Sequence, residues 1–243
     1  LKYEIKKYTI SVKRRCKLLK RDLLTLKDYT AEEINEIIEN AYLIKNKKKN
    51  VESIFFGKSL AMLFQKPSTR TRISFEVAMH QLGGHAIYLN WNDLQLGRGE
   101  SIKDTARTIS RYVDIIMARV FKHEDIETLA KYASVPVMNG LSNLYHPCQI
   151  LGDMLTIKEK KNKIADLKLT FIGDGNNVCN SLLICGSKLG LNVHVACPPG
   201  YEPPDHVTKA ALTYAKSSGA EIKIIHNPKK AAENADIIYT DVW

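Results

Sequence analysis

The sequence lacks the features that mark membrane-spanning, disulfide-bonded and zinc-binding proteins. It has no stretch of about 18 consecutive apolar residues, so no helix is expected to cross a membrane. Its five cysteines show no C-x-x-C spacing, which argues against a disulfide framework or structural zinc and favours a reducing compartment. The seven histidines show no metal-ligand spacing, so no metal is expected. Neither a G-x-S-x-G element nor a P-loop is present.

The net charge of +10 permits attraction to nucleic acid or acidic ligands without specifying either. No recognition helix, zinc finger or aromatic–basic signature is present, so nucleic acid is not an expected partner. Segment 1–16 is basic and has no continuous apolar core, so it predicts no secretory signal and a cytoplasmic chain. A transit-peptide remnant, with a location in the mitochondrial matrix, is the alternative. The first residue is not Met, so we expect further residues upstream.

Composition and periodicity predict a globular α/β protein. Hydrophobic residues make up 44% of the chain, which is enough for a substantial core. Short apolar strands alternate twice with helical patterns, which is typical of parallel sheets covered on both faces. We predict two doubly wound parallel-sheet domains, residues 17–160 and 161–243, with the second incomplete at its C-terminus. The basic extension 1–16 precedes them, and Lys158–Lys163 is the expected linker.

The stretch Ser68–Arg72 lies where a predicted strand, Ser59–Phe64, turns into a helix. That helix is expected from Thr69 to Leu82, with Val77 and Ala78 among its inward-facing residues. The free N–H groups and the macrodipole of a helix N-terminus favour an anion. Two arginines at this end are unfavourable for a bare helix, but they suit a bound phosphate. Two solvated arginines are the plainer alternative.

Other polar residues also follow predicted strands, where ligands of such sheets bind. They are Gln95, Arg119, His146, Gln149, Asn177 and Asp241. Each has an ordinary explanation taken singly: a surface arginine, a structural histidine, a solvated glutamine or a helix cap. Together they indicate a site for an anion beside a polarised carbonyl.

The glycines Gly173 and Gly175 after a predicted strand raise the alternative of an NAD-dependent oxidoreductase. The third glycine of that fingerprint would fall at Val178. The next strand ends near Cys197 without the acidic residue that holds a ribose. This alternative therefore ranks below transfer of an anionic group.

Five stretches in combination resemble motifs of the aspartate and ornithine transcarbamylase family. They are Ser68–Arg72, Leu94–Ser101, His146–Gln149, Gly173–Asn177 and Thr240–Trp243. The first resembles the carbamoyl-phosphate motif and the third the family's His-Pro-x-Gln motif. The last two resemble elements on the ornithine side and favour ornithine over aspartate. Transferases that use aspartate or putrescine remain alternatives.

The resemblance implies transfer of a carbamoyl group from carbamoyl phosphate to L-ornithine, giving L-citrulline and phosphate. It implies that four residues hold the phosphate: Ser68, Thr69, Arg70 and Thr71. Arg119 is expected to bridge the phosphate and the carbonyl oxygen. His146 is expected to donate to that oxygen, and Gln149 to hold the carbamoyl nitrogen. Arg70, Arg119, His146 and Gln149 are thus the expected catalytic residues.

The resemblance further implies that Gln95 reaches the phosphate of a neighbouring subunit in a homotrimer. Asn177 and Asp241 are expected to bind the α-amino and carboxylate end of ornithine. No cofactor or metal is implied. The family's sequence continues beyond the point matched by Trp243, so we expect a longer chain.

Overall fold

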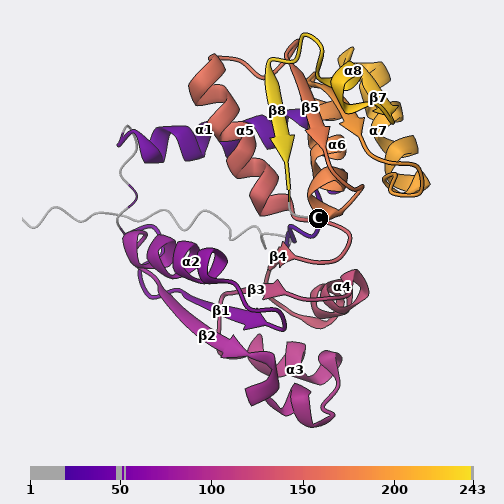
Figure 1. Ribbon diagram of the computed structural model, residues 1–243. Helices are drawn as coiled ribbons and strands as arrows, with labels where there is room; N and C mark the ends of the chain where they lie inside the picture. The colour runs from indigo at the N-terminus through magenta and orange to yellow at the C-terminus, as the bar shows by residue number, and fades with distance from the viewer. Residues whose placement is uncertain (1–19, 48–50, 52, 242–243) are drawn as a thin grey trace, which may run out of the picture.

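The computed structural model describes residues 20–47, 51 and 53–241 as two lobes, each built on a four-stranded parallel sheet (Figure 1). The first sheet has the order β2-β1-β3-β4 and the second the order β7-β6-β5-β8. This confirms the predicted pair of doubly wound sheets. The predicted extension 1–16 lies outside the described residues. The strands are β1 (Ser59–Phe64), β2 (His85–Asn90), β3 (Ile115–Arg119), β4 (Val137–Leu141), β5 (Lys168–Ile172), β6 (Asn192–Ala196), β7 (Ile222–Ile225) and β8 (Ile237–Thr240).

Apolar strands form the centre of each lobe because their side chains are covered on both faces. In β1, every residue from Leu60 to Phe64 is buried. The helices of the first lobe cover both faces of its sheet, with α2 on one and the contacting pair α3 and α4 on the other (Figure 1). They are α2 (Thr69–Gln81), α3 (Ile102–Ile109) and α4 (His123–Tyr132), with the 3-10 turns η2 (Trp91–Asp93) and η3 (Gln95–Arg98) before α3.

The second lobe is organised around α6, which is buried along almost its whole length. It packs against α5, α7 and β6, while α8 lies against β5, β6 and β7. The prediction of a linker over Lys158–Lys163 is wrong for its first four residues, because α5 continues through Lys161. The helix ends there, with Asn162 as its left-handed C-cap. The helices are α5 (Pro147–Lys161), α6 (Asn177–Leu189), α7 (Asp205–Ser218) and α8 (Pro228–Ala232).

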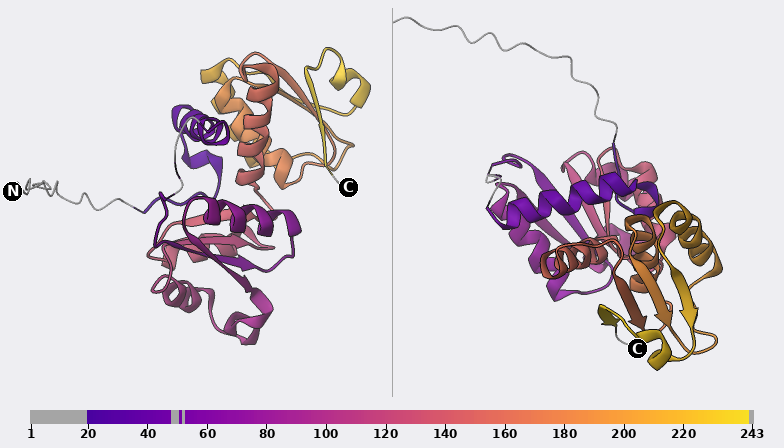
Figure 2. Two further views of the ribbon diagram at one scale, coloured as in Figure 1. Left: turned by 90° about the vertical axis from the view of Figure 1, so that its left-hand side faces the viewer. Right: turned by 90° about the horizontal axis from the view of Figure 1, so that it is seen from above.

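Helix α1 (Ala31–Lys45) comes early in the chain but packs in the second lobe (Figure 2). It begins with a capping box, in which Thr30 and Glu33 satisfy each other's backbone N–H groups. Its buried residues Ile34 and Ile38 belong to the same hydrophobic cluster as Leu182 of α6. The first helix therefore contributes to a core whose other buried members, apart from Leu26, lie more than a hundred residues later.

The segment before α1 connects the two lobes. Leu23 forms a parallel bridge with Met138 of β4 in the first sheet. A few residues later, the turn η1 (Leu26–Asp28) lies against α6. There the ammonium group of Lys188 donates to the carbonyl oxygens of Leu26, Lys27 and Tyr29 at 3.0, 2.7 and 2.5 Å. This segment and the start of α5 together fix where the lobes meet.

Candidate active site

A cleft of about 630 Å³ lies at the carboxyl ends of the strands, between the lobes. In each sheet the chain order reverses at one point, between β1 and β3 in the first and between β5 and β8 in the second. Loops after the two strands at such a reversal diverge to opposite faces, which opens a crevice for a ligand. Eight of the predicted residues line the cleft: Ser68, Arg70, Thr71, Arg119, His146, Gln149, Asn177 and Asp241.

The N-terminus of α2 forms one wall. Ser68 is the N-cap, and its Oγ accepts from the Thr71 N–H at 3.3 Å. The Ser68 hydroxyl also donates to Oγ1 of Thr71 at 3.0 Å. Arg70 lines the cleft, whereas Thr69 is exposed and does not. A helix N-terminus with a cationic side chain beside it is an anion-binding arrangement.

Arg72 does not join Arg70 at this wall, so the expectation of two guanidinium groups on one anion is wrong for α2. Its Nε donates to Glu76 Oε1 at 3.0 Å, one helical turn away. Its guanidinium carbon lies 4.0 Å from the centre of the Tyr88 ring. The prediction that Val77 and Ala78 face inward is also wrong, since both residues are exposed.

Arg119 supplies the second cation. It ends β3, at a register shift against β4 between Ala118 and Arg119. Such irregularities redirect side chains beside functional sites. Arg119 is buried, and its Nε has no hydrogen-bond partner among the described residues. Burial and the nearby charge of Arg70 lower the pKa of Arg119, yet a guanidinium remains protonated at neutral pH.

His146 and Gln149 face the cleft from the start of α5. Pro147 occupies the first turn of that helix, where its missing N–H costs nothing. Burial and the charge of Arg119 lower the pKa of His146 to about 4, although Asp241 opposes this. The imidazole is therefore neutral at physiological pH. Nε2 of Gln149 donates to Oδ1 of Asp153 in α5 at 2.9 Å, so Oε1 of Gln149 remains to accept from a ligand.

The wall from the second lobe is formed by two asparagines and an aspartate. Oδ1 of Asn176 accepts from the N–H groups of Val178 and Cys179 at 3.0 and 3.1 Å and so caps α6. Its Nδ2 donates to Oδ2 of Asp241 at 3.1 Å and fixes that carboxylate. Asn177 donates to the carbonyl oxygen of Ser142 at 2.6 Å, across the lobes.

The cleft is also lined by residues that the sequence reasoning did not select for the site, among them Lys66, Asn176 and Tyr239. Lys66 and Asn176 lie in stretches already recognised as strand ends, so the same rule could have found them. Tyr239 lies within a strand and offered no such signal. Conversely, Gln95 in η3 is exposed and does not line the cleft.

The glycines after β5 do not form an open phosphate cradle. The N–H of Gly175 donates to the carbonyl oxygen of Tyr201 at 2.7 Å. A Cβ atom added to Gly175 would lie 2.2 Å from the backbone nitrogen of Pro203. The chain itself thus packs against Gly175 and pairs its N–H group, which argues against dinucleotide binding at this loop.

Three further properties bear on chemistry. Within the described ranges, no group of three or more His, Cys, Asp or Glu side chains is placed to hold a metal ion. The four cysteines that the structure describes are free thiols, at positions 148, 179, 185 and 197. In the same part of the chain, no helix has the length and apolarity needed to span a membrane.

Comparison with known proteins identifies related sequences and structures. The family model "Aspartate/ornithine carbamoyltransferase, carbamoyl-P binding domain" matches residues 21–159, and the model of the Asp/Orn binding domain matches residues 165–243. The chain is 60% identical over 225 residues to an ornithine carbamoyltransferase of Pyrococcus horikoshii, covering 92% of this chain and 71% of that protein. An ornithine carbamoyltransferase of Halalkalibacterium halodurans is 56% identical, with 92% and 70% covered.

Solved structures agree with this. The ornithine carbamoyltransferase from Pyrococcus furiosus superposes with a TM-score of 0.89 at 60% identity, covering 92% of this chain and 72% of that one. A mitochondrial ornithine carbamoyltransferase from Coccidioides immitis superposes with a TM-score of 0.87 at 38% identity, with 92% and 75% covered. The chain thus spans about seven tenths of the length of these relatives.

Proposed function

The chain belongs to the aspartate/ornithine carbamoyltransferase family, and from that premise we propose that it transfers the carbamoyl group of carbamoyl phosphate to the δ-amine of L-ornithine. The products are L-citrulline and phosphate. One observation carries the proposal: two arginines, a helix N-terminus and a neutral histidine line the same cleft as a fixed carboxylate. The first group suits a phosphorylated carbonyl compound, and the carboxylate suits an amino acid.

Carbamoyl phosphate lies against the first lobe in this proposal. Its phosphate is held by the α2 N-terminus and Arg70, with Ser68 and Thr71 supplying hydroxyl and N–H donors. The burial of Arg119 and its closeness to Arg70 support a role as the bridge between phosphate and carbonyl oxygen. Two close cations repel each other in the free protein, and a bound dianion relieves that repulsion.

His146 donates to the carbonyl oxygen as a neutral imidazole. Its low pKa supports this role, because a neutral ring carries one N–H and one bare nitrogen. The Nδ1 atom is buried without a hydrogen-bond partner among the described residues, which leaves Nε2 as the atom for the substrate. Gln149 uses its remaining Oε1 to accept from the carbamoyl NH₂ group.

Ornithine lies against the second lobe. The carboxylate of Asp241, oriented by Asn176, accepts from the α-ammonium group, and Asn177 binds the same end of the substrate. The δ-amine then points toward the first lobe. Holding both substrates in one cleft supplies the proximity that a bimolecular reaction otherwise lacks.

The transfer itself uses no covalent enzyme intermediate. The lone pair of the neutral δ-amine forms a bond to the carbonyl carbon, and negative charge develops on the carbonyl oxygen. The intermediate collapses as the C–O bond to phosphate breaks, and the amine proton leaves with the phosphate or passes to solvent. Donors that meet the developing charge, here Arg119 and His146, are worth about 3–4 kcal/mol each in comparable sites.

We also propose a homotrimer in the reducing environment of the cytoplasm. The exposure of Gln95 outside its own cleft supports a contact with the phosphate of a neighbouring subunit. The free thiols of the four described cysteines support a reducing compartment. Light scattering measures the mass of the assembly and so tests the trimer. Mixing Gln95→Ala subunits with wild-type subunits, and measuring the activity of the mixed trimers, tests whether Gln95 serves the site of a neighbouring subunit.

The decisive experiment measures the carbamoylated product and the released phosphate when the purified protein is supplied with carbamoyl phosphate and one of three acceptors: ornithine, putrescine or aspartate. We expect product with ornithine, since its α-ammonium group matches Asp241. Aspartate would place its side-chain carboxylate in a cleft that already holds one, and putrescine lacks an α-ammonium group beside a carboxylate. Activity with either acceptor in place of ornithine contradicts the proposal, and so does calorimetry that detects NAD but not carbamoyl phosphate.

A further inference from the structure

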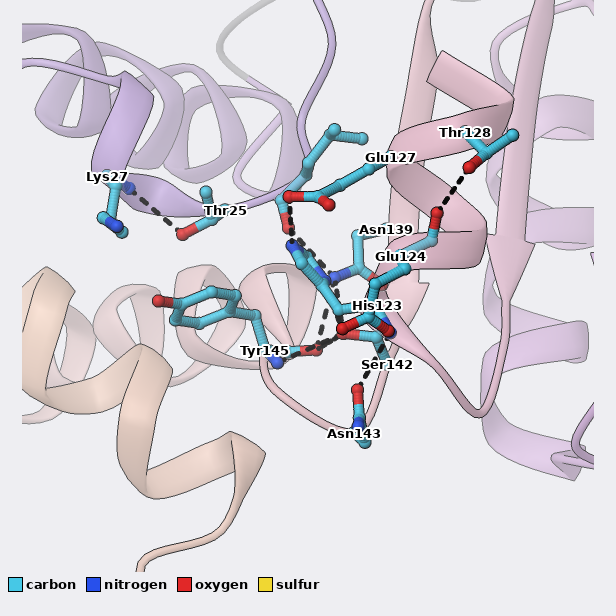
Figure 3. Close-up of polar contacts among 11 residues, drawn as sticks. Thr25, Lys27, His123, Glu124, Glu127, Thr128, Asn139, Ser142, Asn143 and Tyr145 are labelled. Atoms are coloured by element: carbon cyan, nitrogen blue, oxygen red, sulfur yellow. Dashed lines mark hydrogen bonds and ion pairs between the residues drawn. The ribbon is translucent and has the colours of Figure 1, made fainter. Parts of the chain in front are cut away.

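A turn whose first and last residues are buried lies directly before His146 and connects the lobes. In this turn, Ser142–Tyr145, the N–H of Ser142 donates to the carbonyl oxygen of Tyr145 at 3.0 Å. The N–H of Tyr145 in return donates to the Ser142 hydroxyl at 3.2 Å. Both residues are buried, Ser142 completely. The turn is thus closed on itself by a single serine (Figure 3).

From the second lobe, the first turns of α6 hold the Ser142–Tyr145 turn. Asn177 donates to the carbonyl oxygen of Ser142 at 2.6 Å, and Asn180 donates to that of Leu144 at 3.1 Å. The N–H of His146 donates to Oγ of Ser181 at 2.8 Å. Two residues that face the substrates, His146 and Asn177, are therefore fixed through the turn.

From the first lobe, His123 at the start of α4 holds the same turn. Its Nδ1 lies 2.8 Å from the Ser142 hydroxyl, and its backbone N–H donates to Oδ1 of Asn143 at 2.9 Å. Asn139 of β4 adds a donor to the carbonyl oxygen of Tyr145 at 3.3 Å. In Figure 3 these side chains converge on the turn from the strand and from α4.

The direction of the His123 hydrogen bond follows from the other contacts. The Ser142 oxygen already accepts from Tyr145 and, at 3.4 Å, from Asn139, so its own proton is left to donate. Two acceptors lie within its reach, the carbonyl oxygen of Tyr145 at 3.3 Å and Nδ1 of His123 at 2.8 Å, and the shorter contact assigns the proton to His123. Nδ1 is then the bare nitrogen and Nε2 carries the proton, 3.8 Å from Oε1 of Glu127. Burial lowers the pKa of His123, which keeps the ring neutral.

We propose that His123 is a positioning residue of the carbamoyl transfer, which acts by accepting the hydrogen bond of Ser142. The fixed turn then sets the places of His146 and Asn177 in the cleft. The kinetic part of this inference rests on the proposed function, whereas the structural part does not. His123 lies outside the cleft lining and touches no substrate.

The test compares two substitutions of His123. His123→Leu keeps an apolar side chain but offers Ser142 no acceptor. His123→Asn places an amide oxygen at about the position of Nδ1, since both atoms are bonded to Cγ. We expect His123→Leu to lower kcat/KM for citrulline formation about tenfold or more, because small misplacements of catalytic groups are costly. We expect His123→Asn to stay within about threefold of the wild type.

A matched control separates positioning from loss of stability. Ile126→Val changes a fully buried residue of the same helix and should lower the thermal midpoint without altering kcat or KM. A folded His123→Leu protein with wild-type kcat and KM overturns the proposal. So does a loss in His123→Asn equal to that in His123→Leu.

Amide hydrogen exchange provides a second readout that needs no activity. Without its acceptor, the turn should open more often, so the amides of Tyr145 and His146 should exchange at least about tenfold faster in His123→Leu. In His123→Asn they should remain protected. Unchanged exchange in His123→Leu overturns the proposal. If the wild type forms no citrulline while the two variants still differ in exchange as described, only the proposed function is refuted, and the role of His123 in the turn stands.

Discussion

The side-chain amide of Asn176 lies 3.1 Å from Oδ2 of Asp241 and so joins the ends of β5 and β8, the two strands where the order of the second sheet reverses. The same asparagine caps α6 through its Oδ1. Its two ends therefore have separate tasks: the oxygen fixes a helix, and the nitrogen orients a carboxylate toward the cleft.

This division leads to a prediction for Asn176→Asp. The new carboxylate can still accept from the N–H groups at the start of α6, so the cap and the unfolding free energy should be largely kept. The donor to Asp241 is lost, and two carboxylates now face each other. We expect KM for ornithine to rise about tenfold, since a lost charged hydrogen bond is worth roughly 1.5–3 kcal/mol. Steady-state kinetics with varied ornithine measures this.

The control for Asn176→Asp is binding of carbamoyl phosphate, which lies on the other wall. Its Kd, measured by calorimetry without ornithine, should change little. If the substitution weakens carbamoyl phosphate binding and leaves KM for ornithine unchanged, the assignment of the two walls is wrong.

Arg119→Ala should reduce kcat/KM by about a hundredfold or more, because a preorganised donor to the developing oxyanion is lost. The fold should survive, since removing this side chain also relieves its repulsion from Arg70. Arg111→Ala, which removes an exposed arginine at the end of α3, is the charge-matched control and should behave as wild type. Near-wild-type turnover in a folded Arg119→Ala protein would contradict the proposed site.

The low pKa of His146 predicts a pH dependence of stability. The ring titrates at about 4 when folded, against an ordinary value of 6.5, so the unfolded chain binds more protons between these values. The unfolding free energy should therefore fall as the pH falls through this window. His146→Gln should remove that part of the slope, as measured by urea denaturation at about pH 7 and about pH 4.5. Identical slopes in both proteins would show that the histidine is not buried as described.

Two glycine substitutions test the packing of the loop after β5. Gly175→Ala should destabilise the protein by more than about 3 kcal/mol, because the new Cβ would meet backbone atoms of Pro203 that cannot move aside cheaply. Gly152→Ala, in the middle of α5 with open space around it, should stabilise by about 0.5–1 kcal/mol through helix propensity. Urea denaturation measures both. Equal stability of the two variants would show that this loop is not closed by its own chain.

Much of the local structure follows from short-range rules that the sequence carries openly. Thr30 followed three residues later by Glu33 is the sequence signature of a capping box, and it starts α1. Pro147 likewise occupies the first turn of α5. Buried parallel strands read as short apolar runs, so β1 is predicted with its bounds. The motif residues at strand ends, such as Arg119 and Asp241, could also be selected from the sequence before their spatial neighbours were known.

By itself, the sequence determined the α/β class, the paired sheets and the set of polar residues from which a site could be built. It did so because hydrophobic period, caps and strand-end motifs act within a few residues. Only the tertiary structure decided which of those residues meet. It turned Arg72 toward Glu76 and Tyr88, left Thr69 outside the cleft and placed α1 in the second lobe. Strand order and helix packing depend on contacts between residues far apart in the chain, which no local pattern specifies.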